Sequence, residues 1–213
     1  MQCRILALLC AGVSLGLTST APAAFVGVEA VQVANDYNIL TYDIFAHFDG
    51  GAPGNLLFAV TGTSDSPLEI GVHCGTFLQH EFGGDRAPSP LFESMPELEF
   101  DTFVTIGRAV SIADNTMLAP GWPGFGPDVL AMDNSGWFVA PFQPQSFPGV
   151  NGGVLLARLS TLNGHGFYGT MVVNGFSDNL PFDAVVTFDT LPGPGSLALL
   201  AVAGCLQRRR RRR

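Results

Sequence analysis

Short runs of β-favouring residues, separated by glycine and proline, constrain the fold of this chain more than any other feature. Between residues 25 and 190, no stretch keeps an apolar period of 3.6 over about twelve residues, the pattern typical of a surface helix. The 26 glycines and 15 prolines instead divide the chain into short segments rich in Val, Thr, Phe and Tyr. The sequence therefore predicts an all-β body.

We expect strands at residues 26–33, 37–48, 56–61, 98–106, 154–162, 167–173 and 184–188. Residues 163–166 are Asn-Gly-His-Gly, a hairpin loop whose glycines accept positive φ. Roughly eight to ten short strands with turns about every 8–12 residues favour an antiparallel β-sandwich, and a jelly roll is the alternative. Residues 83–96 and 114–147 are rich in Pro and Gly and are expected to be long loops.

The charges of the chain are segregated. All 18 acidic residues lie between Glu29 and Asp189, where Arg86, Arg108 and Arg158 are the basic residues, so this part carries a formal charge of −15. Such a surface repels phosphate backbones, which excludes nucleic acid as a partner of the body. An apolar content of 47% with 13% charged residues also argues against intrinsic disorder.

Residues 1–24 have the pattern of a secretory signal peptide. Arg4 supplies the positive charge, residues 5–17 the apolar segment, and Ala21-Pro22-Ala23 the small-residue cleavage site. The expected partners are the Sec export machinery and signal peptidase, and a buried N-terminal helix is the alternative. Cleavage would remove Cys3 and Cys10. Cys74 and Cys205 would remain on segments with different destinations, so no intramolecular disulfide is expected.

Residues 191–213, the sorting tail, follow the body, which spans residues 25–190. Gly195–Leu206 would be about 18 Å long as a helix, whereas a bilayer core is about 30 Å thick, so a permanent span is not expected. The positive-inside rule places the body outside the cytoplasm. The tail has three parts: a break at Pro192, Gly193 and Pro194; an apolar helix containing Leu197, Leu199, Leu200, Val202 and Leu206; and a stop-transfer cluster of Arg208, Arg209, Arg210, Arg211, Arg212 and Arg213.

This order of Pro-x-Pro break, apolar segment and arginine cluster resembles the PEP-CTERM sorting domain of Gram-negative bacteria. The resemblance covers about 22 residues and implies recognition by an exosortase-type membrane protease, with transient inner-membrane anchoring and then release to the cell surface or extracellular matrix. Gly193 stands where that family has a central glutamate. In the body, residues 102–107, 136–139 and 154–158 are similar to runs in exported planctomycete proteins of unknown function, a resemblance that supplies no activity.

Metal-capable side chains are densest at His73, Cys74, His80, Glu81 and Asp85. A structural zinc site needs paired ligands, and His80-Glu81 lacks the second histidine of a zincin helix, so a free Cys74 and loop histidines are expected instead. Cys74 with His80 lacks a third group to orient a nucleophile–base pair. No catalytic residue and no cofactor is assigned from these patterns.

Oxygen-rich turns are the calcium candidates of the sequence. Asp133, Asn134 and Asp178 belong to such turns, but none has the register of a calcium loop. The alternative is that these side chains bond backbone N–H groups as Asx turns.

Two further sets of side chains carry alternative functions. Trp122 and Trp137, the two tryptophans, lie in or beside the second long loop and suit stacking on a polysaccharide; the alternative is that they pin the loop to the sandwich. A pair of catalytic carboxylates for a polysaccharide hydrolase would come from Glu93, Glu97, Glu99 and Asp101.

The expectation from the sequence is thus an exported, non-enzymatic cell-surface or extracellular-matrix protein. A carbohydrate-binding module associated with exopolysaccharide is the first alternative, and a polysaccharide hydrolase is the second.

Overall fold

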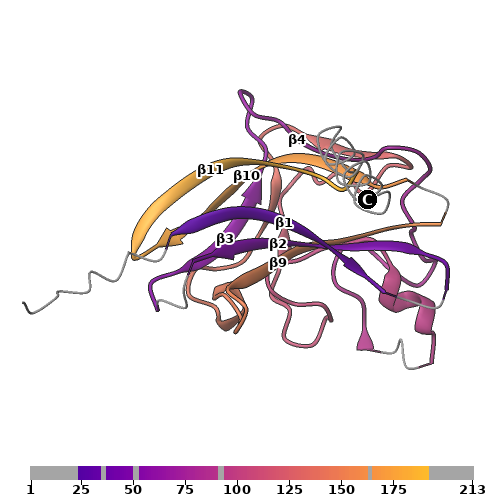
Figure 1. Ribbon diagram of the computed structural model, residues 1–213, viewed down its shortest axis with the longest axis horizontal. Helices are drawn as coiled ribbons and strands as arrows, with labels where there is room; N and C mark the ends of the chain where they lie inside the picture. The colour runs from indigo at the N-terminus through magenta and orange to yellow at the C-terminus, as the bar shows by residue number, and fades with distance from the viewer. Residues whose placement is uncertain (1–23, 35–36, 50–52, 91–93, 163–164, 192–213) are drawn as a thin grey trace, which may run out of the picture.

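The computed structural model describes residues 24–34, 37–49, 53–90, 94–162 and 165–191 (Figure 1). Residues 1–23 of the predicted signal peptide, residues 192–213 of the sorting tail with its apolar helix, and the first two residues of the predicted 163–166 hairpin loop lie outside the described residues.

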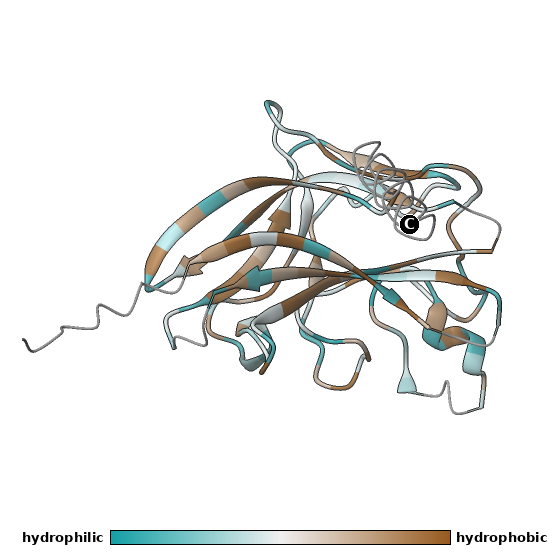
Figure 2. Cartoon of the chain, viewed as in Figure 1, coloured by the Kyte–Doolittle hydropathy of each residue, from teal (hydrophilic) through white to brown (hydrophobic). Residues whose placement is uncertain are grey.

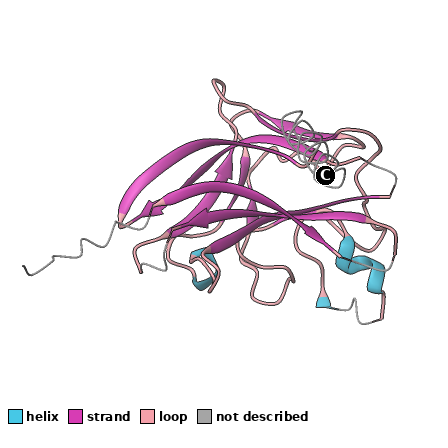
Figure 3. Cartoon of the chain, viewed as in Figure 1, coloured by secondary structure: helices cyan, strands magenta, loops and turns pink. Residues whose placement is uncertain are grey.

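The described residues form two antiparallel sheets, which confirms the all-β prediction at that level. Strands joined by long loops dominate, with only short helical turns between them (Figure 3). The strands are β1 (Phe25–Val33), β2 (Leu40–Phe48), β3 (Leu56–Thr61), β4 (Leu68–Val72), β5 (Phe103–Val104), β6 (Met117–Leu118), β7 (Val129–Met132), β8 (Gly136–Phe138), β9 (Gly153–Thr161), β10 (Phe167–Ser177) and β11 (Leu180–Asp189), and the 3₁₀-helices are η2 (Pro96–Phe100) and η3 (Pro144–Ser146).

The first sheet has the order β1-β2-β9-β5. In β2, the buried side chains of Ile44, Ala46 and Phe48 alternate with Phe45 and His47 on the other face. This period of two is what a strand with one buried face requires. Figure 2 shows hydrophobic and hydrophilic residues mixed along the strands.

The second sheet is built around β10. Its Val173 pairs with Val60 of β3, while its Thr170 pairs with Glu69 of β4, so β3 and β4 lie end to end along one edge of β10. β8 pairs with β3, β7 pairs with β4, and β6 pairs with β8. β11 pairs with the opposite edge of β10 along its whole length.

Gly62 explains how β3 continues into β4 after the chain loops out between them. A Cβ at Gly62 would lie 2.4 Å from both the Leu68 backbone N and the Met132 carbonyl O, so only glycine fits this approach. The excursion closes on itself, because Thr63 N donates to Ser66 O at 2.9 Å. Two separate short strands therefore act as one interrupted strand of the sheet.

The hydrophobic core lies between the two sheets. Ile44 and Leu156 of the first sheet join Val60, Met171 and Trp137 of the second in one cluster of buried residues. At one end the outer strands of the two sheets come together, where the Phe25 ring of β1 stacks on Phe182 of β11 with centroids 4.8 Å apart. Figure 1 shows β1 and β11 close at this end.

Two expectations about local structure were wrong. Residues 98–106 were expected to be one strand, but η2 occupies the first part and only Phe103–Val104 pairs as β5. Pro96 at the start of η2 explains this, because its fixed φ suits a helical turn. The long loop expected at 114–147 contains β6, β7 and β8, which are short strands at the margin of the second sheet.

Candidate ligand-binding pocket

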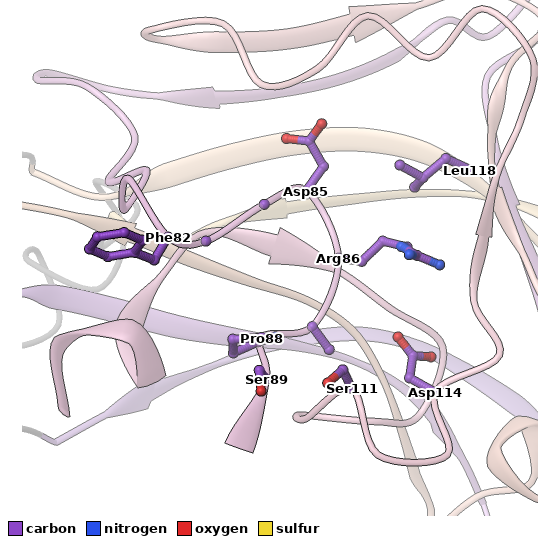
Figure 4. A pocket seen from close by; sticks show the side chains of 11 residues that line it. Phe82, Asp85, Arg86, Pro88, Ser89, Ser111, Asp114 and Leu118 are labelled. Carbon is purple, nitrogen blue, oxygen red and sulfur yellow. The ribbon is translucent and has the colours of Figure 1, made fainter. Parts of the chain in front are cut away.

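A polar pocket of about 370 Å³ opens between the loop at residues 82–89 and the segment at residues 111–118. Arg86 and Asp114 come from these two different segments, whereas the Asp85 carboxylate points away from both (Figure 4). Its lining residues are Phe82, Gly83, Gly84, Asp85, Arg86, Ala87, Pro88, Ser89, Ser111, Asp114 and Leu118.

The buried carboxylate of Asp101 shapes the first wall of the pocket. Its two oxygens accept the backbone N–H groups of His80 at 2.7 Å and Gly84 at 3.1 Å. A Cβ at Gly83 would lie 1.8 Å from Asp101 Oδ2, so the loop closes over the carboxylate only because Gly83 has no side chain. Burial raises the pKa of Asp101, while the backbone hydrogen bonds act in the opposite direction.

Asp85 attaches the same wall to the neighbouring loop. The indole Nε1 of Trp122 donates to Asp85 Oδ2 at 2.8 Å. The Trp122 ring also packs edge-on against Phe125 and Trp137, with centroids 6.3 and 6.0 Å away. Asp85 is therefore engaged in holding two loops together.

Asp114 lies in the second wall of the pocket, the segment at residues 111–118, and hydrogen bonds hold its side chain in place. Its Oδ1 accepts from Thr116 N at 3.0 Å, from Thr116 Oγ1 at 2.5 Å and from Gln145 Nε2 at 3.0 Å. Gln145 is itself buried and also donates to Ile106 O at 2.7 Å. Asp114 Oδ2 makes no hydrogen bond within the part of the chain that the structure describes.

Arg86 is the exposed cation of the pocket. Its Nη1 donates to the carbonyl O of Thr116 at 3.2 Å, which links the two walls. No ion pair within 4.0 Å joins Arg86 to a carboxylate among the described residues. The pocket thus presents guanidinium N–H donors and a carboxylate acceptor to the same space.

A larger hollow of about 580 Å³ lies against β1 and β2. Within the hollow, His47 Nε2 lies 2.9 Å from Glu29 Oε2, although the two atoms do not form a hydrogen bond. Asp43, also in the lining, accepts from Arg158 Nε at 2.7 Å. The smaller pocket at Arg86 is therefore the better candidate for recognition of a polar ligand.

The two tryptophans proposed to stack on sugars are placed differently. Trp137 is 0% exposed and its Nε1 donates to Thr105 O at 3.0 Å, so its ring offers no face to a ligand in this conformation. Trp122 is half-buried against the core, with its indole N–H bound to Asp85. The geometry of both is that of the alternative hypothesis, in which these rings pack the loop against the sheets.

The metal-capable side chains do not converge. His73 Nε2 lies 2.9 Å from Asp189 Oδ1, His80 Nδ1 accepts from Phe82 N at 3.2 Å, and Cys74 is free and exposed. Throughout the described ranges, no group of three or more His, Cys, Asp or Glu side chains could hold a metal ion. Asp133 and Asp178 are among the carboxylates that belong to no such group.

The calcium candidates occupy tight turns. Asn134 has a φ of 49° between β7 and β8, and Asp178 has a φ of 53° between β10 and β11. The left-handed region is one that Asn and Asp tolerate better than other side chains. The backbone N–H of Asp178 also donates to Asn55 Oδ1 at 2.9 Å. These positions therefore have a conformational role in the turns that they occupy.

Of the predicted carboxylate set, Glu93 lies outside the described residues. Glu97 and Glu99 are in the first turn of η2, and Asp101 follows its end as the buried loop anchor described above.

Across the described part of the chain, no helix is long and apolar enough to cross a membrane.

Reasoning from the sequence missed Arg86, Asp114 and Ser111 as neighbours in one pocket. The signal was available only for Arg86, because it is one of three arginines in a body with 18 acidic residues. No known protein-family model and no curated protein matches this chain.

Proposed function

We propose that this chain is an exported, non-enzymatic protein of the cell surface or extracellular matrix, delivered by a sorting tail of the PEP-CTERM type. The observation that carries the proposal is the pair of terminal signals: the Ala21-Pro22-Ala23 cleavage site at one end and the break, apolar segment and arginine cluster at the other. The two signals give the same orientation, with the body outside the cytoplasm.

The body is proposed to be an antiparallel β-sandwich, with a signal helix before it and a short apolar helix after it. Support comes from the shared core of the two sheets, which includes Leu156 and Val60. The four leucines and one valine of residues 197–206 contribute roughly −0.5 kcal/mol each to insertion, on the order of −2.5 kcal/mol together. Such a segment suits a transient anchor better than a permanent one.

The proposed partners follow from this route: the Sec export machinery, signal peptidase and an exosortase-type membrane protease. Gly193 in place of the family's glutamate makes cleavage of the tail the step that most needs a test. No nucleic acid and no cofactor is proposed. A bound calcium ion is the alternative. An unchanged melting temperature in excess EDTA would rule out that alternative.

The non-enzymatic assignment is supported by what the carboxylates of the body do. Asp101 binds the backbone of the 80–84 loop, and Asp85 binds Trp122. Each of these acids stabilises a loop. The competing hydrolase function predicts turnover of a polysaccharide that a single change such as Glu97→Gln abolishes.

Carbohydrate binding is the second candidate function, because the pocket at Arg86 combines donors, acceptors and an exposed aromatic ring. Phe82 at its edge is 65% exposed. If Trp122 were the platform, Trp122→Ala would abolish binding to exopolysaccharide without unfolding the chain.

Fractionation of the native host tests the main proposal. The body is expected first in the inner-membrane fraction and later at the surface or in the medium. A chain that stays in the cytoplasmic fraction with residues 1–24 intact would contradict export.

A further inference from the structure

We propose that the pocket between residues 82–89 and 111–118 binds a neutral, polyhydroxylated ligand, such as a hexose unit of a glycan. Arg86 would donate to the ligand hydroxyls and Asp114 would accept from them. The inference gives a site and a ligand class to the carbohydrate-binding candidate above, and it rests on that candidate rather than on the sorting tail.

The first argument is the unpaired arrangement of opposite charges. Arg86 and Asp114 line one cavity from different walls, yet no ion pair within 4.0 Å joins them in the described part of the chain (Figure 4). A hydroxyl group donates one hydrogen bond and accepts others, so it can lie between a guanidinium and a carboxylate and satisfy both. Vicinal hydroxyls on a sugar ring repeat this pattern.

The second argument is that both groups are preorganised and keep capacity for a ligand. Asp114 Oδ1 accepts three hydrogen bonds from Thr116 and Gln145, which leaves Oδ2 for a ligand. Arg86 Nη1 is held on the Thr116 carbonyl, which leaves the other N–H groups of the guanidinium. Groups that are already ordered lose little conformational entropy when a ligand binds.

The third argument is the apolar part of the lining. Phe82, Pro88 and Leu118 contribute apolar surface to the same pocket as the polar side chains. A pyranose has C–H faces as well as hydroxyls, and aromatic rings pack against such faces. A volume of about 370 Å³ falls in the ordinary range for small-ligand sites, roughly 300–1,000 Å³.

Charge decides against an anionic ligand. The body carries a formal −15, and the pocket lining itself has two aspartates, Asp85 and Asp114, for one arginine. A uronic-acid polymer would be repelled on approach and would leave the Asp114 carboxylate facing another carboxylate. A neutral glycan has no such penalty.

The test uses the full-length chain on immobilised oligosaccharides built from glucose, galactose, mannose or N-acetylglucosamine, with polyglucuronate as the anionic comparison. Two variants probe the site: Arg86→Gln, which removes the charge, and Phe82→Ala, which removes an exposed ring. Phe142→Ala is the matched control, because Phe142 is 68% exposed and lies outside the pocket lining. Circular dichroism checks the fold of each variant.

The proposal expects a neutral oligosaccharide to bind the chain. Arg86→Gln should weaken that binding about tenfold or more, as loss of a hydrogen bond to a charged group does. Phe82→Ala should also weaken it, because the ring that packs against the sugar face is lost. Phe142→Ala should bind unchanged. The proposal would be overturned if the chain retained no neutral glycan, or if both pocket variants bound as tightly as the unaltered chain. It would also be overturned by a preference for polyglucuronate that Arg86→Gln abolishes, since polyglucuronate bound only through Arg208–Arg213 would not depend on Arg86. Surface delivery of the Phe82→Ala chain, measured separately by fractionation, should be normal, so failure here is distinct from failure of the export proposal.

Discussion

Arg158 forms a bidentate ion pair with Asp43: Nε donates to Oδ1 at 2.7 Å and Nη2 donates to Oδ2 at 2.9 Å. The two side chains are only 9% and 13% exposed. Nη1 also donates to the carbonyl O of Glu99 at 2.8 Å, and the guanidinium lies 5.8 Å from the centre of the Phe103 ring. One side chain therefore joins β2, β9, η2 and β5 on the first sheet.

Arg158→Met should destabilise the fold strongly, because it leaves the Asp43 carboxylate largely buried without its partner. Breaking such a pair from one side costs about 3–5 kcal/mol, and the double variant with Asp43→Asn should recover part of that loss. Urea unfolding measures both. A cost below about 1 kcal/mol for the single variant would mean that the pair behaves like an exposed one.

Gly107 and Gly121 provide a matched pair for separating backbone strain from steric overlap. Both have positive φ, 76° and 85°, but a Cβ at Gly107 would lie 1.9 Å from Gln145 O, whereas a Cβ at Gly121 meets nothing within 4 Å. Gly121→Ala should cost only about 1–2 kcal/mol for the left-handed backbone. Gly107→Ala should cost clearly more, because η3 must move. Equal urea unfolding midpoints for the two variants would contradict the close approach of the Gln145 carbonyl to Gly107.

Asp101 should make stability fall as pH rises. Its folded-state pKa is raised above the ordinary 3.8, so its contribution is fully present below pH 3.8 and is lost as pH rises through the folded pKa. Relative to Asp101→Asn, the original chain should therefore lose stability across that window. The measurement is urea unfolding of both proteins at a series of pH values, and a difference independent of pH would contradict the assignment.

Asp189 should change the pH dependence of stability in the opposite direction from Asp101. The backbone N–H of Leu191, and then the side chain of His73, lower its pKa below 3.8. Its contribution is therefore present above pH 3.8 and is lost as pH falls through the lowered value. Relative to Asp189→Asn, the original chain should therefore keep a constant stability advantage above pH 3.8 and lose that advantage as pH falls below it. An advantage that stays unchanged in acid would contradict the assignment.

Runs of β-favouring residues predicted the long strands well, including β1, whose side chains are half-buried or exposed. The expected strand at 154–162 corresponds to β9, Gly153–Thr161, whose side chains are almost all buried. β4 and β7 were missed, since strands of five and four residues give too few alternations to recognise. Their pairing depends on the interruption at Gly62, which long-range contacts create and local sequence does not show.

The candidate site was less predictable for a related reason. Arg86 and Asp114 are brought together by a loop anchor, Asp101, and by Gln145 from yet another segment. None of these residues forms a spacing motif with the others. Trp122 was singled out for its ring, yet what the sequence could not show was its partner, Asp85, 37 residues earlier.

The arginine cluster should be required for retention at the inner membrane. Replacing Arg208–Arg213 by neutral residues removes the stop-transfer charge, so the newly made chain should leave the membrane fraction early. Pulse-labelling followed by fractionation measures this. Unchanged retention would mean that the apolar segment alone holds the chain.

The most direct test of the account is intact-mass analysis of the mature protein recovered from the cell surface and medium. The account predicts a species that begins after Ala23 or Ala24 and ends between Pro192 and Gly195, without the apolar segment and the arginines. A mature surface species that still carries Arg208–Arg213 would contradict processing of the tail, and would make it a permanent anchor.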